Sequence, residues 1–202
     1  MSIRAFLLVL LLAPGVVRAQ DDVENRLLDV TPLAGQQVAV LPLTYVIADP
    51  ALETDSLWAP WTDRRLALRR ADSLVSGELE MRAPEVTWIL PADLRKLYRR
   101  APGMLQDPDQ LGQAMLRNER MDRVPDQLNA SLRKYSAMAG GRMVLVPAAT
   151  AFSPSLDGTI RADLSLALVD SRRGLVVWRS RAVGLGPTPD AALRAAAALV
   201  FP

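Results

Sequence analysis

The sequence predicts an α/β protein with a single mixed five-stranded sheet flanked by helices, in the order β-α-β-α-α-α-β-β-β-α. Two short runs, Val38–Leu41 and Met143–Val146, are apolar at every position, which is typical of strands buried on both faces. Segments with helical spacing of apolar residues separate the early strands, so those strands should pair in parallel. The last three strands have short connections and should pair antiparallel.

Residues 1–19 have the pattern of a secretory signal peptide. A basic start at Arg4 precedes an apolar run over Ala5–Ala13, and Val17-Arg18-Ala19 places small or compact residues before Gln20. The run is about half of the ~20 residues that a membrane span needs. We expect cleavage near Ala19-Gln20, a mature chain without a transmembrane segment, and a periplasmic or secreted location.

The mature chain should consist of a lead-in segment over residues 20–34 and a single α/β domain over residues 35–202. After the first strand, a loop over Ile47–Pro60 should precede a long helix over Thr62–Arg82. The apolar residues of this helix recur at spacings of three, four and four, and Ala83-Pro84 ends it. Arg69 and Asp72 should form a pair on its polar face.

The middle of the chain predicts one strand and three helix starts. A strand over Val86–Leu90 runs directly into a helix over Pro91–Arg100, which begins with proline in its first turn. Asp107, Pro108 and Gln110 are spaced as the start of a second helix. A third helix should begin at Pro125 and end before Gly140-Gly141.

The last part of the chain predicts a long hairpin and a final helix. Residues Ile160–Leu168 alternate between apolar and polar, as in a half-exposed strand. Asp170–Gly174 should form the turn and Leu175–Val183 the returning strand. Thr188 should cap an alanine-rich helix that runs to about Leu199.

The composition excludes several kinds of active site, because the chain contains neither cysteine nor histidine. Thiol nucleophiles, Ser-His-Asp triads and the usual zinc sites all need one of them. Ser131 and Lys134 have Ser-x-x-Lys spacing, but the companion motifs of penicillin-binding enzymes are missing. We therefore expect no catalytic residue, no metal and no cofactor. The alternative is an exported hydrolase that uses carboxylates on a glycan or wall polymer.

The charge does not favour nucleic-acid binding. The formal net charge is +2, but Arg4 and Arg18 lie in the signal peptide while every acidic residue follows it. The mature chain is therefore formally neutral, and no nucleic-acid motif accompanies its arginines.

Four residues are candidates for binding a partner: Trp58, Trp61, Arg64 and Arg65. The tryptophans lie in a proline-containing loop, and exposed aromatic residues often anchor interfaces. The adjacent arginines could contact an anionic surface. The alternatives are that the tryptophans cover the edge of the core and that the arginines lie on a solvated helix face.

Three stretches resemble a family of bacterial envelope proteins: Gly35–Leu43, Val86–Leu97 and Gly141–Trp178. They are similar to parts of the TolB amino-terminal domain, the penicillin-binding-protein activator LpoB and the CsgG-type secretion proteins. The resemblance implies a small mixed α/β domain that binds proteins in the periplasm and performs no chemistry. The chain lacks the lipobox cysteine of LpoB and CsgG, the propeller of TolB and the membrane hairpins of CsgG.

These observations together predict an exported, non-enzymatic binding or accessory protein of the bacterial cell envelope. It should act through contacts with envelope proteins. A second possibility that the resemblance leaves open is a subunit of an outer-membrane assembly.

Overall fold

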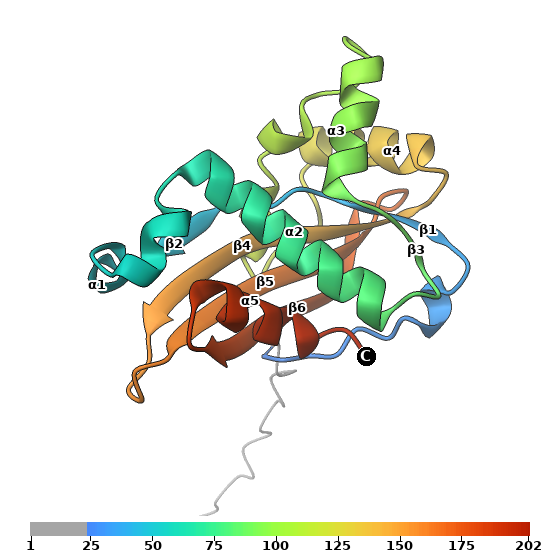
Figure 1. Cartoon of the computed structure of the whole chain (residues 1–202). Coiled ribbons are helices and arrows are strands. Elements are labelled where there is room, and N and C mark those ends of the chain that lie inside the picture. Colours follow the sequence, from blue (N-terminus) through green and yellow to red (C-terminus); the bar gives the residue numbers. More distant parts are fainter. Residues whose placement is uncertain (1–23) are drawn as a thin grey trace, which may run out of the picture.

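The computed structural model describes residues 24–202, and one sheet lies at the centre with helices on both faces (Figure 1). The predicted signal peptide and its cleavage position lie outside the described residues. The strands are β1 (Gln37–Val40), β2 (Val46–Ala48), β3 (Thr87–Ile89), β4 (Met143–Pro154), β5 (Ile160–Asp170) and β6 (Leu175–Gly186). The α-helices are α1 (Pro50–Glu53), α2 (Arg64–Arg82), α3 (Pro91–Arg100), α4 (Asp126–Met138) and α5 (Pro189–Ala198).

The sheet confirms the predicted mixture of parallel and antiparallel pairing. Its order is β3-β1-β4-β5-β6, with β2 paired to β4 beside this path. β1 pairs in parallel with both β3 and β4, and the helical crossovers between them explain this direction. β4, β5 and β6 form an antiparallel meander.

Two segments differ from the sequence prediction in detail. The predicted loop over Ile47–Pro60 contains most of a sixth strand, β2, which pairs in parallel with Thr150–Phe152 of β4. The helix expected from Asp107 is replaced by two 3₁₀ turns, Pro108–Gln110 and Gln113–Arg117. Gly112, between these turns, has a φ of +75°, a left-handed conformation that interrupts a right-handed helix.

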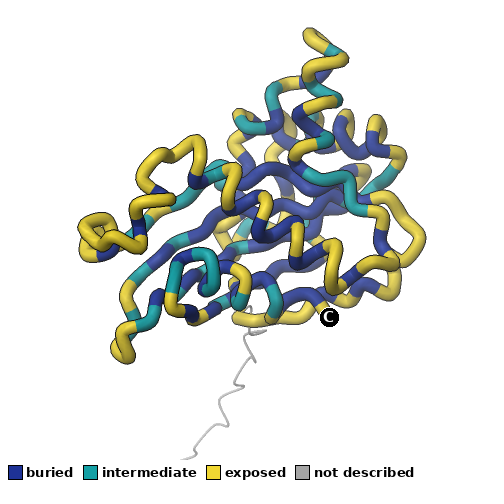
Figure 2. Tube along the Cα trace, viewed as in Figure 1, coloured by how far each residue is buried: buried dark blue, intermediate teal, exposed yellow. Residues whose placement is uncertain are grey.

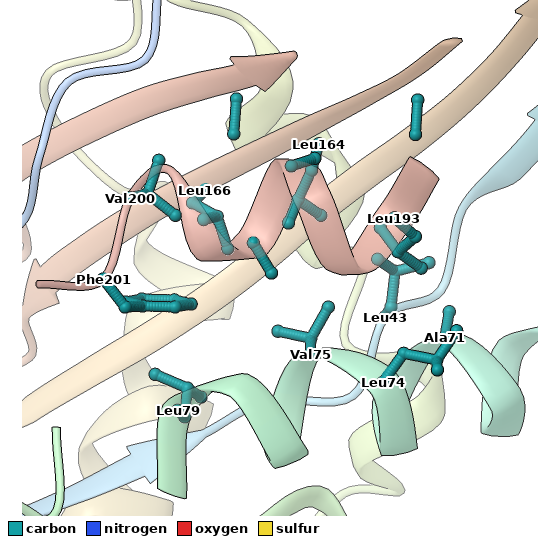
Figure 3. Close-up of a cluster of buried hydrophobic side chains, with 14 of the residues drawn as sticks. Leu43, Ala71, Leu74, Val75, Leu79, Leu164, Leu166, Leu193, Val200 and Phe201 are labelled. Carbon is teal, nitrogen blue, oxygen red and sulfur yellow. The ribbon is translucent and has the colours of Figure 1, made fainter. Parts of the chain in front are cut away.

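One face of the sheet is covered by α2 and α5. Figure 3 shows side chains of both helices meeting above the strands, with Leu79 of α2 and Leu193 of α5 among them. From the sheet, Leu164 and Leu166 of β5 reach the same layer. Arg161, Asp163 and Ser165 alternate with these residues and are half-buried, which confirms the predicted half-exposed pattern up to Leu166. Beyond it Ala167 and Val169 are buried in the layer on the opposite face.

The opposite face is covered by α3, α4 and the segment between them. Leu94 of α3 and Leu132 of α4 are fully buried against it. Ala39 of β1 faces this layer, whereas its neighbours Val38 and Val40 face the other. Figure 2 shows the central strands as the most continuous buried part of the chain, as expected from strands that are apolar at every position.

Helix α5 lies directly against β6, because two glycines leave room for its backbone. A Cβ atom on Gly184 would lie 2.1 Å from the backbone nitrogen of Ala196, and one on Gly186 would lie 2.5 Å from that of Ala192. The small side chains of the alanine-rich helix complete this close contact. Any larger residue at these two glycines would push the helix away from the sheet.

Candidate functional site

A cleft bordered by two of the predicted site residues, Arg64 and Arg65, lies between the first half of α2 and the second half of α3. Its volume is about 630 Å³, within the range of ligand-binding pockets. We call it the α2–α3 cleft. Its lining residues are Arg64, Arg65, Leu68, Arg69, Arg95, Tyr98, Arg99, Asp107, Asp109 and Gln110.

A second hollow of about 410 Å³ extends this cleft along α2 towards the start of α3. The two share Arg69 and Arg95, and the second also reaches Asp72. The two hollows therefore adjoin each other between the two helices, with Arg69 and Arg95 between them.

Helix geometry gathers the arginines at this cleft. The Asp63 carboxylate accepts a hydrogen bond from the backbone nitrogen of Leu66 at 2.9 Å and starts α2, so that Arg64 and Arg65 fall in its first turn. In α3, Arg95, Tyr98 and Arg99 are spaced by three and four residues and therefore lie on one face.

Arg95 is the buried centre of an ion-pair network at the base of the cleft. Its residue surface is only 8% exposed. One guanidinium nitrogen, Nη2, lies 2.6 Å from Asp72 Oδ2 and 2.6 Å from Asp109 Oδ1, while Nε donates to Asp109 Oδ2 at 2.9 Å. The other oxygen of Asp72 accepts a hydrogen bond from the Leu43 backbone nitrogen at 2.7 Å. Arg95 thus joins α2, α3 and the turn over Pro108–Gln110.

The protonation of this network follows from burial and charge. Burial raises the pKa of Asp72 to about 6, although the Leu43 N–H and the Arg95 charge favour its ionised form. Burial disfavours the charged form of Arg95, but Asp109 and Asp72 outweigh it and raise the pKa of Arg95 above its ordinary value. Arg95 therefore stays charged at neutral pH.

The predicted pair between Arg69 and Asp72 does not form. Asp72 is buried and turns to Arg95, because a buried carboxylate needs a partner that also reaches beneath the surface. Arg69 is left exposed at the cleft, with no carboxylate within 4.0 Å among the described residues.

The same holds for three further arginines of the cleft, Arg64, Arg65 and Arg99. All are exposed, and none forms an ion pair within the described part of the chain. Arg64 makes one long hydrogen bond, from Nη2 to the Thr44 carbonyl oxygen at 3.4 Å. Cations in the first turn of a helix oppose its dipole, so helix stability does not explain Arg64 and Arg65.

The carboxylates of the cleft are engaged in holding its shape. Both oxygens of Asp109 accept hydrogen bonds from Arg95. Asp107 Oδ1 accepts a hydrogen bond from the Asp109 backbone nitrogen at 3.0 Å and caps the turn over Pro108–Gln110. A general acid or base must exchange its proton with a substrate, and these contacts leave Asp109 committed to Arg95.

The structure places the rings of Trp58 and Trp61 in the core. The two residues are 6% and 3% exposed, and their ring centroids stack 5.7 Å apart. Both rings also pack edge-on against Phe152 of β4, and Trp61 Nε1 donates to Asp190 Oδ1 at 3.0 Å. These positions agree with the alternative that the tryptophans cover the edge of the core.

The four predicted residues nevertheless lie close together. Trp58, Trp61 and Arg64 border a hollow of about 260 Å³ beside β2, and Arg64 also lines the α2–α3 cleft with Arg65. Arg64 thus connects the two hollows. That any of the four binds a partner stays a prediction.

The residues that define the cleft were not foreseen as a group. Asp72, Arg95 and Asp109 lie in separate elements, and no motif links them in the sequence. The one local signal was a carboxylate close to the apolar face of α2, next to Ala71. That position is buried in the structure.

Two further findings concern residues 24–202. None of their helices combines the length and the apolar character needed to cross a membrane. No group of three or more acidic, histidine or cysteine side chains among these residues is arranged to hold a metal ion.

Comparison with known proteins finds similar solved structures only. No family model matches the sequence, and no curated protein matches it. A PelC dodecamer subunit from Paraburkholderia phytofirmans is 16% identical with a TM-score of 0.41, covering 82% of this chain and 84% of that one. The LpoB C-terminal domain from Salmonella enterica is 14% identical with a TM-score of 0.38, over 74% of this chain and 82% of that one. Lipoprotein GNA1162 from Neisseria meningitidis is 17% identical with a TM-score of 0.32, over 75% and 81%. The resemblance to LpoB is thus a distant one.

Proposed function

We propose that the chain is an exported accessory protein of the bacterial cell envelope, which acts by binding another protein and catalyses no reaction. The observation that carries the proposal is the α2–α3 cleft. Its exposed arginines have no carboxylate partner among residues 24–202, whereas its carboxylates are engaged within the fold. A surface of this kind is suited to bind and orient a partner protein. It lacks a free pair of facing carboxylates for hydrolysis.

Export is supported by the signal-peptide pattern of residues 1–19. Expression in a Gram-negative host, followed by fractionation and mass spectrometry, tests this part. We expect the protein in the periplasm or the medium, with an N-terminus at or near Gln20. Recovery of the uncleaved chain from the cytoplasm would contradict it.

Partner binding is tested by crosslinking in the cell, followed by mass spectrometry of the captured proteins. The test variant is Arg64→Glu/Arg65→Glu at the cleft, and the matched control is Arg172→Glu/Arg173→Glu in the β5–β6 turn. Both replace two adjacent exposed arginines and change the charge equally. We expect an envelope protein that is captured by the native chain and the control and is lost with the cleft variant. Capture of no envelope protein above background would overturn the proposal.

A further inference from the structure

We propose that the α2–α3 cleft binds an extended acidic peptide segment, whose carboxylates pair with its exposed arginines. The inference rests on the proposed function, because the segment would belong to the partner protein. It specifies the chemistry of that segment.

The strongest argument is the contrast between two successive residues of α2. Arg70 forms a bidentate pair with Asp190 of α5, with its Nε and Nη2 atoms 2.7 and 2.6 Å from the two carboxylate oxygens. Arg69 faces the cleft and has no such partner among the described residues. The same helix thus satisfies one arginine internally and leaves its neighbour available for an external carboxylate.

Arg95 shows the binding geometry that the cleft supports. Its Nε and Nη2 atoms hold both oxygens of Asp109 in a fork at 2.9 and 2.6 Å. Planar guanidinium groups recognise carboxylates in this way, and four more of them stand around the same space. Because the Arg95 network joins α2 to α3, the two helices that carry the exposed arginines are held together before a ligand arrives, which lowers the entropic cost of binding.

The remaining lining residues favour a peptide over a polyanion. Asp107 and Asp109 lie among the arginines in the cleft wall, which suits a ligand with both acidic and uncharged units better than a phosphodiester chain with a charge on every unit. The amide nitrogen of Gln110 donates to the second oxygen of Asp107 at 3.5 Å, and the amide oxygen of Gln110 offers an acceptor for a peptide N–H group. Half-buried Leu68 and Tyr98 provide an apolar surface for a side chain between two acidic residues.

The shape indicates an extended ligand. The second hollow adjoins the cleft along α2, and the spaces of about 630 Å³ and about 410 Å³ share Arg69 and Arg95. A small inorganic anion would occupy only a fraction of either space. Several peptide residues in an extended conformation would reach across both hollows.

The test uses two fluorescein-labelled synthetic peptides of equal length, Gly-Glu-Asp-Leu-Glu-Asp-Gly and its amide counterpart Gly-Gln-Asn-Leu-Gln-Asn-Gly. Binding to the mature chain is measured by fluorescence anisotropy at low ionic strength and at 0.15 M salt. We expect the acidic peptide to bind at least about tenfold more tightly than the amide peptide, with affinity falling as salt rises. Equal binding of the two peptides, or no binding of either at millimolar protein, would overturn the inference.

The location of binding is tested with the two double variants defined above. Arg64→Glu/Arg65→Glu should weaken binding of the acidic peptide about tenfold or more, whereas Arg172→Glu/Arg173→Glu should change it less than about twofold. A milder variant, Arg69→Gln/Arg99→Gln, with circular dichroism as a check of folding, should weaken it as well. Equal losses with the cleft and the turn variants would overturn the assignment to this cleft.

Two outcomes separate this inference from the proposed function. If crosslinking captures an envelope protein through the cleft while the acidic peptide does not bind, the function stands and the peptide chemistry is wrong. If the peptide binds at the cleft while no envelope protein is captured, the peptide chemistry stands and the proposed function is wrong. Binding to phosphatidylglycerol vesicles that depends on Arg64 and Arg65, without binding of the peptide, would replace the peptide with a membrane surface.

Discussion

Arg95 and Arg179 are both buried arginines, but they are held in opposite ways. Arg95 lies between two carboxylates at the α2–α3 cleft. Arg179 of β6 is 9% exposed and has no carboxylate within 4.0 Å in the described chain. It donates instead to the carbonyl oxygens of Leu116 and Met121, the latter at 2.6 Å.

Because their partners differ, the two arginines stabilise the fold in different ways. Burial lowers the pKa of Arg179, and the opposing attraction of Asp122 and Glu119 is weaker. Removal of the guanidinium group from water therefore disfavours its charged form more than these two carboxylates favour it. Through neutral acceptors Arg179 fastens the second 3₁₀ turn, at Leu116, and the loop after it, at Met121, to the sheet. Arg95 instead joins two helices through full charges, and its removal leaves the buried carboxylate of Asp72 without a cation.

The largest effect is expected from Arg95→Met. The substitution leaves Asp72 buried without its cation, and loss of one partner of a buried pair costs about 3–5 kcal/mol. Urea unfolding at pH 7 measures this loss. The double variant Arg95→Met/Asp72→Asn should recover part of this loss, because the buried side chain at position 72 is then neutral. If Arg95→Met cost no more than Arg179→Met, the contrast between the two arginines would be wrong.

The next effect concerns pH and Asp72. The pKa of Asp72 is raised from an ordinary value of 3.8 to about 6, so between these values the folded protein holds a proton that the unfolded chain has lost. The free energy of unfolding should therefore fall as pH rises from about 4 to about 6, by at most about 1.4 kcal/mol per pH unit, and level off above. In Asp72→Asn this decline should be absent. Parallel pH profiles of the two proteins would contradict the assignment.

A smaller loss is expected from Arg179→Met. Two carbonyl oxygens, of Leu116 and Met121, lose their donor, which costs about 1–3 kcal/mol. Because Asp122 and Glu119 act on Arg179 only from beyond 4.0 Å, the loss should change little between pH 4 and pH 7. Urea unfolding at both pH values measures it, and a strong pH dependence would show that a charged partner had been overlooked.

The smallest effect is expected from an exposed pair on α3. Lys96 and Asp93 lie 2.8 Å apart with side chains about half exposed. Solvent and salt screen such a pair, so Lys96→Met should cost no more than about 0.5 kcal/mol. Thermal unfolding at low and high salt provides the measurement. A loss as large as that of Arg95→Met would remove the distinction between buried and exposed pairs on the same helix.

Much of the fold could be predicted because its signals are local. Val38–Leu41 and Met143–Val146 are apolar at every position, and the spacing of apolar residues in α2 identifies a helix without knowledge of its neighbours. β2 was missed because three half-exposed residues carry no such pattern. It forms only because β4 extends beyond the predicted strand and offers Thr150–Phe152 as partners.

Only the exposed arginines of the candidate site could be predicted from the sequence, and its buried ion pairs could not. Arg64 and Arg65 are visible as a charged pair at a helix start, and the structure places both at the α2–α3 cleft. The sequence alone places Asp72 on a polar helix face, because its partner Arg95 lies on another helix and leaves no local signal. Only tertiary packing decides that such a carboxylate is buried and paired across the fold.

The parallel pairing of β1 has a consequence for how the chain folds. Val38 pairs with Met143, and α2, β3, α3 and α4 all lie between them. β1 is therefore synthesised early but reaches its central place only after β4 has been made, whereas β4, β5 and β6 meet through short turns. Closing so long a loop is slow. Until β1 pairs with β4, one of the most apolar segments of the chain stays exposed to other unfolded molecules. The meander should collapse first, and the hazard of aggregation should centre on residues 37–43 until the crossover closes.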